Sequence, residues 1–176
     1  MKEKNTVVDE NDNVLGAKYR EDIGIDEIYR VSALWIINSK DEILLARRGY
    51  SKKRDPGKWG PAVAGTIAEN ETYEENIKRE AEEEIGVTNY DFGKGIKRFS
   101  HLTHKYFAKT FLAKLDWNEK DFKLDEREVA EVRWFSLDEL KKEMKDHPEE
   151  FINTMPKRIE FLYPGDKLIN FEELGE

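Results

Sequence analysis

Four glutamates lie between positions 79 and 84, in the segment KREAEEEIG of residues 78–86. Positions i, i+3 and i+4 are neighbours on a helix, so Glu80, Glu83 and Glu84 would share one arc of its surface. Like charges spaced i,i+4 destabilise a helix by about 0.2–0.5 kcal/mol, and clustered carboxylates are hard oxygen ligands that suit Mg²⁺ or Mn²⁺. The spacing therefore predicts a divalent-cation site, with a solvated charged face as the alternative interpretation.

A group of cations precedes the acidic segment, in and just before a polar loop. The six cations are Arg47, Arg48, Lys52, Lys53, Arg54 and Lys58. Arg48 and Lys52 are the candidates for binding an anionic substrate, because a forked guanidinium and an ammonium both bind phosphate. The alternative is a solvated, mobile loop. Trp59 follows the loop and is a candidate for stacking on a nucleobase, with burial in the core as the alternative.

The acidic segment is predicted to form the end of one well-defined helix. Thr72 and Glu75 form a capping-box pattern at its start, and Gly86 is the residue type that ends a helix in the left-handed conformation. An apolar residue recurs at every fourth position, which predicts a stripe packed on a sheet. The stripe consists of Tyr73, Ile77, Ala81 and Ile85.

The remaining segments predict a mixed sheet. Alternating apolar residues and turn residues indicate two N-terminal hairpins, a short strand after the basic loop, a later strand pair and a final strand. These strands fall within residues 6–20, 29–48, 60–68, 90–117 and 128–135. A helix over 136–147 follows, with Ser136 as its N-cap, and a further helix is expected over 148–165. The order predicts an α+β fold, an α/β/α sandwich with helices on both faces of a mixed sheet.

Composition limits the class of protein. A chain of 176 residues fits a single domain over 1–176, with an N-terminal strand extension over 1–29 and a C-terminal helical tail over 147–176. The net charge of −8 argues against duplex nucleic acid as a partner, and the absence of cysteine excludes thiolate chemistry. No segment is apolar enough for a signal peptide or a membrane span. We therefore expect a cytoplasmic monomer or homodimer without membrane contact.

The helix and the residues before it resemble a known motif. Residues 65–87 fit the Nudix box, in which a glycine, a glutamate and the pattern Arg-Glu-aliphatic-x-Glu-Glu-x-Gly-aliphatic stand at fixed spacings. The matching residues are Gly65, Glu71, Arg79, Glu80, Ala81, Glu83, Glu84, Gly86 and Val87. Ala81 is small for its position. The resemblance implies the Nudix fold and the hydrolysis of a nucleoside diphosphate linked to another group.

The same resemblance implies roles for the box residues. The implied metal ligands are Glu80, Glu83, Glu84 and the backbone carbonyl of Ala64. Bound Mg²⁺ or Mn²⁺ lowers the pKa of a water ligand, and Glu80 would double as the base. Arg79 would join Glu80 and Glu83 in the catalytic group by orienting Glu83 or Glu71. The residues implied to be structural are Gly65, Glu71 and Gly86.

Residues 7–87 resemble the branch of the superfamily that includes isopentenyl diphosphate isomerase. That isomerase uses a cysteine in the strand before the box glycine, where this chain has Ala64, and a methyl group can act neither as acid nor as nucleophile. The isomerase's later Glu-x-Glu pair falls on His104 and Tyr106. We therefore predict an isomerase-like hydrolase of a small phosphorylated substrate. The alternatives are an isomerase-like protein and a non-catalytic nucleotide-binding module.

Some Nudix hydrolases take a further carboxylate from a distant loop. Candidates here precede the final strand, with surface charge as the alternative interpretation; they are Glu128, Glu126 and Glu131. His101 and His104 are expected to be structural residues or weak substrate contacts.

Overall fold

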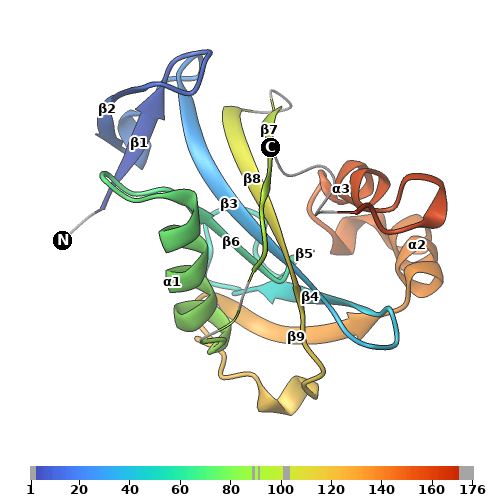
Figure 1. Ribbon diagram of the computed structural model, residues 1–176. Coiled ribbons are helices and arrows are strands. Elements are labelled where there is room, and N and C mark those ends of the chain that lie inside the picture. Colours follow the sequence, from blue (N-terminus) through green and yellow to red (C-terminus); the bar gives the residue numbers. More distant parts are fainter. Residues whose placement is uncertain (1–2, 89, 91, 101–103, 171–176) are drawn as a thin grey trace.

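The computed structural model describes residues 3–88, 90, 92–100 and 104–170, which form a nine-stranded mixed sheet flanked by helices (Figure 1). The strands are β1 (Lys4–Val8), β2 (Val14–Tyr19), β3 (Ile28–Ile37), β4 (Ile43–Arg48), β5 (Trp59–Pro61), β6 (Val63–Thr66), β7 (Ile96–Ser100), β8 (Lys105–Lys114) and β9 (Val129–Phe135). The α-helices are α1 (Tyr73–Ile85), α2 (Leu137–Asp146) and α3 (Met155–Leu162). Short 3₁₀ segments cover Arg20–Asp22, Glu119–Asp121, Pro148–Glu150 and Pro164–Asp166.

Strand β3 is the centre of the sheet. It pairs antiparallel with β1, β4 and β6, and it pairs parallel with β8 from Ile28 opposite Lys105 to Ile37 opposite Lys114. The antiparallel pairs β1–β2, β3–β4 and β7–β8 confirm the predicted hairpins. Among the described strands, β6 pairs with β3 alone, which leaves its other edge unpaired beside α1.

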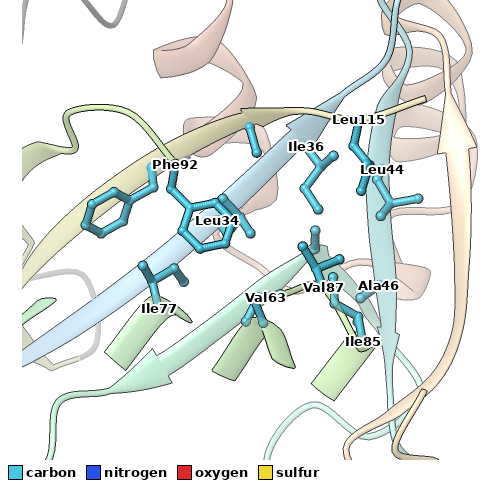
Figure 2. Close-up of a cluster of buried hydrophobic side chains, with 14 of the residues drawn as sticks. Leu34, Ile36, Leu44, Ala46, Val63, Ile77, Ile85, Val87, Phe92 and Leu115 are labelled. Atoms are coloured by element: carbon cyan, nitrogen blue, oxygen red, sulfur yellow. The ribbon is translucent and has the colours of Figure 1, made fainter. Parts of the chain in front are cut away.

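The two faces of the sheet carry separate apolar clusters, as the alternation of side chains along β3 requires. Leu34 and Ile36 pack with α1 in the first cluster, part of which Figure 2 shows. Trp35 and Ile37 pack with α2 and α3 in the second cluster. Helices therefore cover both faces (Figure 1), and the predicted α+β sandwich is confirmed.

Helix α1 has the ends that its sequence predicts. The Thr72 hydroxyl accepts a hydrogen bond from the Glu75 backbone N–H, and the Glu75 carboxylate accepts one from the Thr72 backbone N–H. Gly86 ends the helix with φ of 72° and ψ of 21°, a conformation that glycine adopts without strain. The predicted apolar stripe is buried along its whole length: Tyr73, Ile77, Ala81 and Ile85.

Two predicted elements differ from the structure. The single strand expected over 60–68 is two strands, because the chain leaves β4 after β5 and joins β3 as β6. The helix expected over 148–165 begins as α3 only at Met155. Before it, Phe151 forms a bridge with Trp59, and the Ile152 backbone N–H donates to the Trp59 carbonyl, so this segment is held extended. The helix with Ser136 as N-cap is confirmed as α2.

The helices of the described residues are too short or too polar to span a lipid bilayer.

Candidate active site

Glu80 lies where α1 packs most closely on β6. A Cβ atom at Gly65 would stand 2.6 Å from both Cγ and Oε1 of Glu80, so only glycine leaves room for this position of the Glu80 side chain. The Glu80 side chain is 17% exposed. Burial raises its pKa, the charges of Glu83 and Glu71 raise it further, and Arg79 opposes the rise. The ionised form of Glu80 is therefore less favoured than that of a solvent-exposed glutamate.

Glu84 lies one turn further along the same arc. Burial, followed by repulsion from Glu80, raises the pKa of Glu84 to about 8. The cations Lys52 and Arg48 and a backbone hydrogen bond from Ala64 act in the opposite direction. Two neighbouring carboxylates are thus held where their negative charge is costly. A divalent cation at this position would offset that cost.

The backbone of Ala64 faces this acidic arc. Ile67 donates its N–H to the Arg30 carbonyl, and bonded residues alternate along an antiparallel pair. The backbone groups of Ala64 and Thr66 therefore point away from β3, toward the unpaired edge of β6. In agreement, the Thr66 carbonyl accepts a hydrogen bond from Asn76 Nδ2, and Ala64 hydrogen-bonds Glu84.

Arg79 connects the carboxylates of the box. Its Nε donates to Glu71 Oε1 at 2.9 Å and its Nη1 donates to Glu83 Oε2 at 3.0 Å, while Nη2 lies 3.1 Å from Glu80 Oε1. Glu71 also accepts from the Ala68 backbone N–H at 2.9 Å, so it fixes the loop before the helix. Arg79 therefore contacts Glu71 and Glu83, its expected partners, and also Glu80.

Sequence reasoning missed Asn76. Its side chain is fully buried: Oδ1 accepts from Ser32 Oγ at 2.5 Å, and Nδ2 donates to Glu71 Oε2 at 2.8 Å. Asn76 therefore ties α1 to both β3 and the loop. Asn76 is four residues before Glu80, so it lies on the same helical arc, and its polar side chain beside the apolar stripe was the available signal.

The basic loop and the acidic arc are brought together. Burial lowers the pKa of Arg48 and of Lys52, and the negative charge of Glu84 opposes this lowering in both. Arg48 Nε donates to the Arg54 carbonyl at 3.0 Å. Lys52 forms an ion pair with Glu128, so this candidate carboxylate lies beside the basic loop.

Other candidates lie apart from this cluster. Trp59 is 4% exposed and packs edge-on against Phe135 at 5.4 Å, so its ring has no free face for a nucleobase. The Arg47 guanidinium lies over the Trp59 ring, 4.6 Å from its centre, and forms an ion pair with Glu131. The charges of Arg47 and Glu131 therefore neutralise each other. Glu126 is exposed.

Two histidines were expected to be structural residues or weak substrate contacts. His101 lies outside the described residues. The Nδ1 atom of His104 is buried without a hydrogen-bond partner in the described part of the chain. The ring of Tyr29 lies between those of His104 and Tyr106, at 6.4 Å and 5.7 Å.

The donor chemistry fits a hard divalent cation. Buried carboxylate oxygens beside a backbone carbonyl are the ligands that Mg²⁺ and Mn²⁺ prefer. Across residues 3–88, 90, 92–100 and 104–170, however, no three His, Cys, Asp or Glu side chains are grouped as a metal site. Glu83 accepts the Arg79 hydrogen bond through Oε2 alone, so its second carboxylate oxygen is not used in that bond.

Comparisons with known proteins identify the family of this chain. The NUDIX domain family model matches residues 27–155. A prenyl-diphosphate phosphatase of Methanosarcina mazei is 30% identical over 155 residues, covering 86% of this chain and 90% of the relative. An isopentenyl-diphosphate Delta-isomerase of Photorhabdus laumondii is 32% identical over 97 residues, covering 54% of this chain and 55% of the relative.

A solved structure shows the same fold. DR0079 from Deinococcus radiodurans superposes with a TM-score of 0.75, at 22% identity, over 92% of this chain and 99% of the other. The matched family segment spans more than half of the chain and contains the whole box with its helix. The chain therefore belongs to the Nudix hydrolase family, in the branch that includes isopentenyl-diphosphate isomerase.

Proposed function

We propose that this protein is a hydrolase dependent on Mg²⁺ or Mn²⁺ that splits a pyrophosphate linkage in a small phosphorylated molecule, with water attacking phosphorus. The observation that supports this most directly is the juxtaposition of two partly buried carboxylates, Glu80 and Glu84, with two cations, Arg48 and Lys52. Acidic groups that can hold a metal and basic groups that can hold a phosphate face each other, as phosphoryl transfer requires.

The proposed roles follow from the contacts. Glu80, Glu83 and Glu84 with the Ala64 carbonyl would hold the cation, which when bound neutralises phosphoryl charge and acidifies water. Arg48 and Lys52 would bind the diphosphate. Arg79 would position Glu83 and, through Glu71, the loop before α1.

Glu80 is the proposed general base. A base works best when its pKa lies near the pH of the reaction. Burial moves the pKa of the Glu80 carboxyl upward, in that direction.

The proposed substrate is a nucleoside diphosphate linked to another group. A prenyl diphosphate is the second candidate, since a relative that shares most of its length with this chain is named a prenyl-diphosphate phosphatase. The position of Trp59 favours the prenyl diphosphate as a candidate. Trp59, which would have bound a nucleobase by stacking, is packed in the core.

Two other functions have less support. Isomerisation requires an acid where the chain has Ala64, in register with Ala33 on β3. A binding module without catalysis would have no use for Glu80 and Glu84, whose burial costs stability. Conversion of isopentenyl diphosphate would establish the first alternative, and calorimetric nucleotide binding without product would establish the second.

A substrate panel tests the proposal. Nucleoside triphosphates, nucleotide sugars, dinucleotides and prenyl diphosphates are assayed with Mg²⁺ or Mn²⁺, using wild type, Glu83→Gln and Glu82→Gln. Glu82 is an exposed glutamate on the same helix and provides the matched control. We expect Glu83→Gln to lower turnover by at least about tenfold, the smallest loss typical near a metal, and Glu82→Gln to have little effect. No turnover by wild type, or full turnover by Glu83→Gln, would contradict the proposal.

A further inference from the structure

Residues 123–128, here called the connector, lie just before β9 and contact both the acidic helix and the basic loop. At the end of α1, the Lys123 backbone N–H donates to the Ile85 carbonyl at 3.1 Å, and the Asp125 backbone N–H donates to the Glu84 carbonyl at 3.0 Å. These bonds satisfy carbonyls that the last turn of a helix leaves without a partner. The connector is therefore fastened to the turn that carries Glu84.

The other end of the connector holds the basic loop. The Gly49 backbone N–H donates to the Glu128 carbonyl at 2.8 Å, and the Ser51 hydroxyl donates to the Arg127 carbonyl at 3.3 Å. The Lys52 ammonium forms an ion pair with the Glu128 carboxylate. A Cβ atom at Gly49 would stand 2.3 Å from the Arg127 carbonyl oxygen, so only glycine allows the two backbones to lie this close.

Asp125 holds the connector in its own shape. The Asp125 carbonyl accepts hydrogen bonds from the backbone N–H groups of Glu128 and Val129, both at 2.8 Å. Its carboxylate accepts from the Arg127 backbone N–H at 3.1 Å, from Arg127 Nε at 3.0 Å and from Arg127 Nη2 at 2.7 Å. The bonds from the Arg127 side chain, followed by the backbone bond, lower the pKa of Asp125 to about 2, so its carboxylate is ionised at neutral pH. A turn with these internal bonds can keep the basic loop in one place relative to α1.

We propose that the connector is a positioning element that fixes Lys52 relative to Glu84, and that Glu128 is the positioning residue that acts through Lys52. An ammonium has three donors, so Lys52 can hold Glu128 and a phosphate oxygen at the same time. Polar loops are commonly mobile, and a misplacement of about 1 Å can cost about 100-fold in rate. This inference rests on the proposed function, because it assumes that the acidic arc and the basic loop bind one ligand together.

A double-mutant cycle tests the role of Glu128. Calorimetry measures the binding of methylenediphosphonate, a pyrophosphate analogue with a P–C–P linkage, in the presence of Mg²⁺. The proteins compared are wild type, Glu128→Gln, Lys52→Gln and the double variant. We expect Glu128→Gln to weaken binding at least about threefold in wild type and to have no further effect in the Lys52→Gln background, because residues in contact are coupled. Glu74→Gln is the matched control and should bind like wild type, since Glu74 pairs with Lys109 at similar exposure but away from the connector.

Gly49→Ala tests the backbone contact. The new methyl group would overlap the Arg127 carbonyl, which cannot rotate away as a side chain does, so the loop must shift. We expect phosphonate binding to weaken about tenfold or more, as loss of a charged contact does. Hydrogen exchange should also be faster at the Lys52 backbone N–H, which donates to the Gly49 carbonyl at 3.1 Å. Gly60→Ala, whose methyl group would make an ordinary contact at 3.5 Å, should resemble wild type in both measurements.

The outcomes separate this inference from the proposed function. An equal loss from Glu128→Gln in both backgrounds would overturn the inference, because Glu128 would then act without Lys52. Tighter binding in Glu128→Gln would also overturn it, by showing that Glu128 competes with phosphate for Lys52. Wild-type binding in both Glu128→Gln and Gly49→Ala would do the same. If wild type binds the phosphonate but hydrolyses no substrate, the proposed function fails and the cycle still decides the positioning role. If wild type neither binds nor hydrolyses, both fail.

Discussion

At the scale of single residues, ionisation of Glu80 and Glu84 disfavours the folded state, because the pKa of each is raised. The pKa of Glu84 is about 8 in the folded chain, against an ordinary value of 4.5. Between these values Glu84 binds more protons in the folded state than in the unfolded state, so its contribution to the free energy of unfolding falls as pH rises from about 4.5 to about 8. Ionisation of Glu84 thus lowers the stability of the folded protein in the pH range where metal binding needs an ionised carboxylate.

Glu84→Gln tests this reasoning. In the presence of a chelator, we expect the variant to be more stable than wild type at pH 8, and its stability to depend less on pH between 5 and 8. Urea unfolding at the two pH values measures both effects. Glu82→Gln, on the exposed side of α1, should retain the wild-type slope. A Glu84→Gln protein that is less stable than wild type at pH 8 would show that Glu84 is stabilised as an anion, against its raised pKa.

The residues of the site differ in how far their positions could be predicted. Glu80 and Glu84 could be placed on one arc because helical spacing is local. Asn76 could not be placed, because its hydrogen bond with Ser32 joins residues 44 positions apart. The role of Trp59 could not be decided from the sequence, because an aromatic residue after a polar loop can either pack in the core or stack on a ligand.

At the scale of elements, α1 was predictable from end to end and the sheet only in part. The capping box, the apolar stripe and the terminal glycine of α1 are all encoded within fifteen residues, Thr72 to Gly86. The hairpins are encoded by their own turns. The parallel pairing of β3 with β8 has no local signal, because its register depends on packing between segments about 77 residues apart, such as Ile28 and Lys105.

The contact between α1 and β6 leads to a prediction. In Gly65→Ala the new methyl group would overlap Glu80 Cγ and Oε1, so the carboxylate must move while the backbone can remain in place. We expect the variant to fold and turnover to fall about 100-fold, as misplacement of a catalytic group by about 1 Å does. Steady-state kinetics and circular dichroism measure the two effects.

The control for this change is Gly60→Ala. There the new methyl group would meet only Ile152 Cδ1, at an ordinary distance of 3.5 Å. Activity near the wild-type value in Gly65→Ala would mean that Glu80 works from more than one position. That result would argue against a ligand fixed by close packing on β6.

At the scale of the whole molecule, the site is assembled from parts that the sheet brings together. Helix α1 covers one face, α2 and α3 cover the other, and the hairpin β1–β2 extends the sheet beyond β3 (Figure 1). Carboxylates come from α1 and cations come from the loop after β4. The hairpin is bonded to the segment after β6, where the Thr6 backbone N–H donates to the Ile67 carbonyl. A change in the attachment of the hairpin should therefore affect the loop before α1.

Asp12 offers that experiment. Its carboxylate joins Arg30 of β3 and Lys97 of β7, and Tyr73 Oη of α1 lies 3.5 Å away. Removing one partner of a buried ion pair costs about 3–5 kcal/mol, and since Lys97 is half exposed we expect Asp12→Ala to lose about 3 kcal/mol in urea unfolding. Asp26→Ala should lose less than about 1 kcal/mol, because Asp26 is 88% exposed in its pair with Lys105.

The same variant tests whether the hairpin supports the loop before α1. Asp12→Ala should speed hydrogen exchange in β1, in β2 and at the Glu69 backbone N–H, which donates to the Lys4 carbonyl. Asp26→Ala should leave these exchange rates unchanged. A loss of stability in Asp12→Ala with unchanged exchange at Glu69 would show that the backbone hydrogen bonds between β1 and that loop persist without the Asp12 attachment.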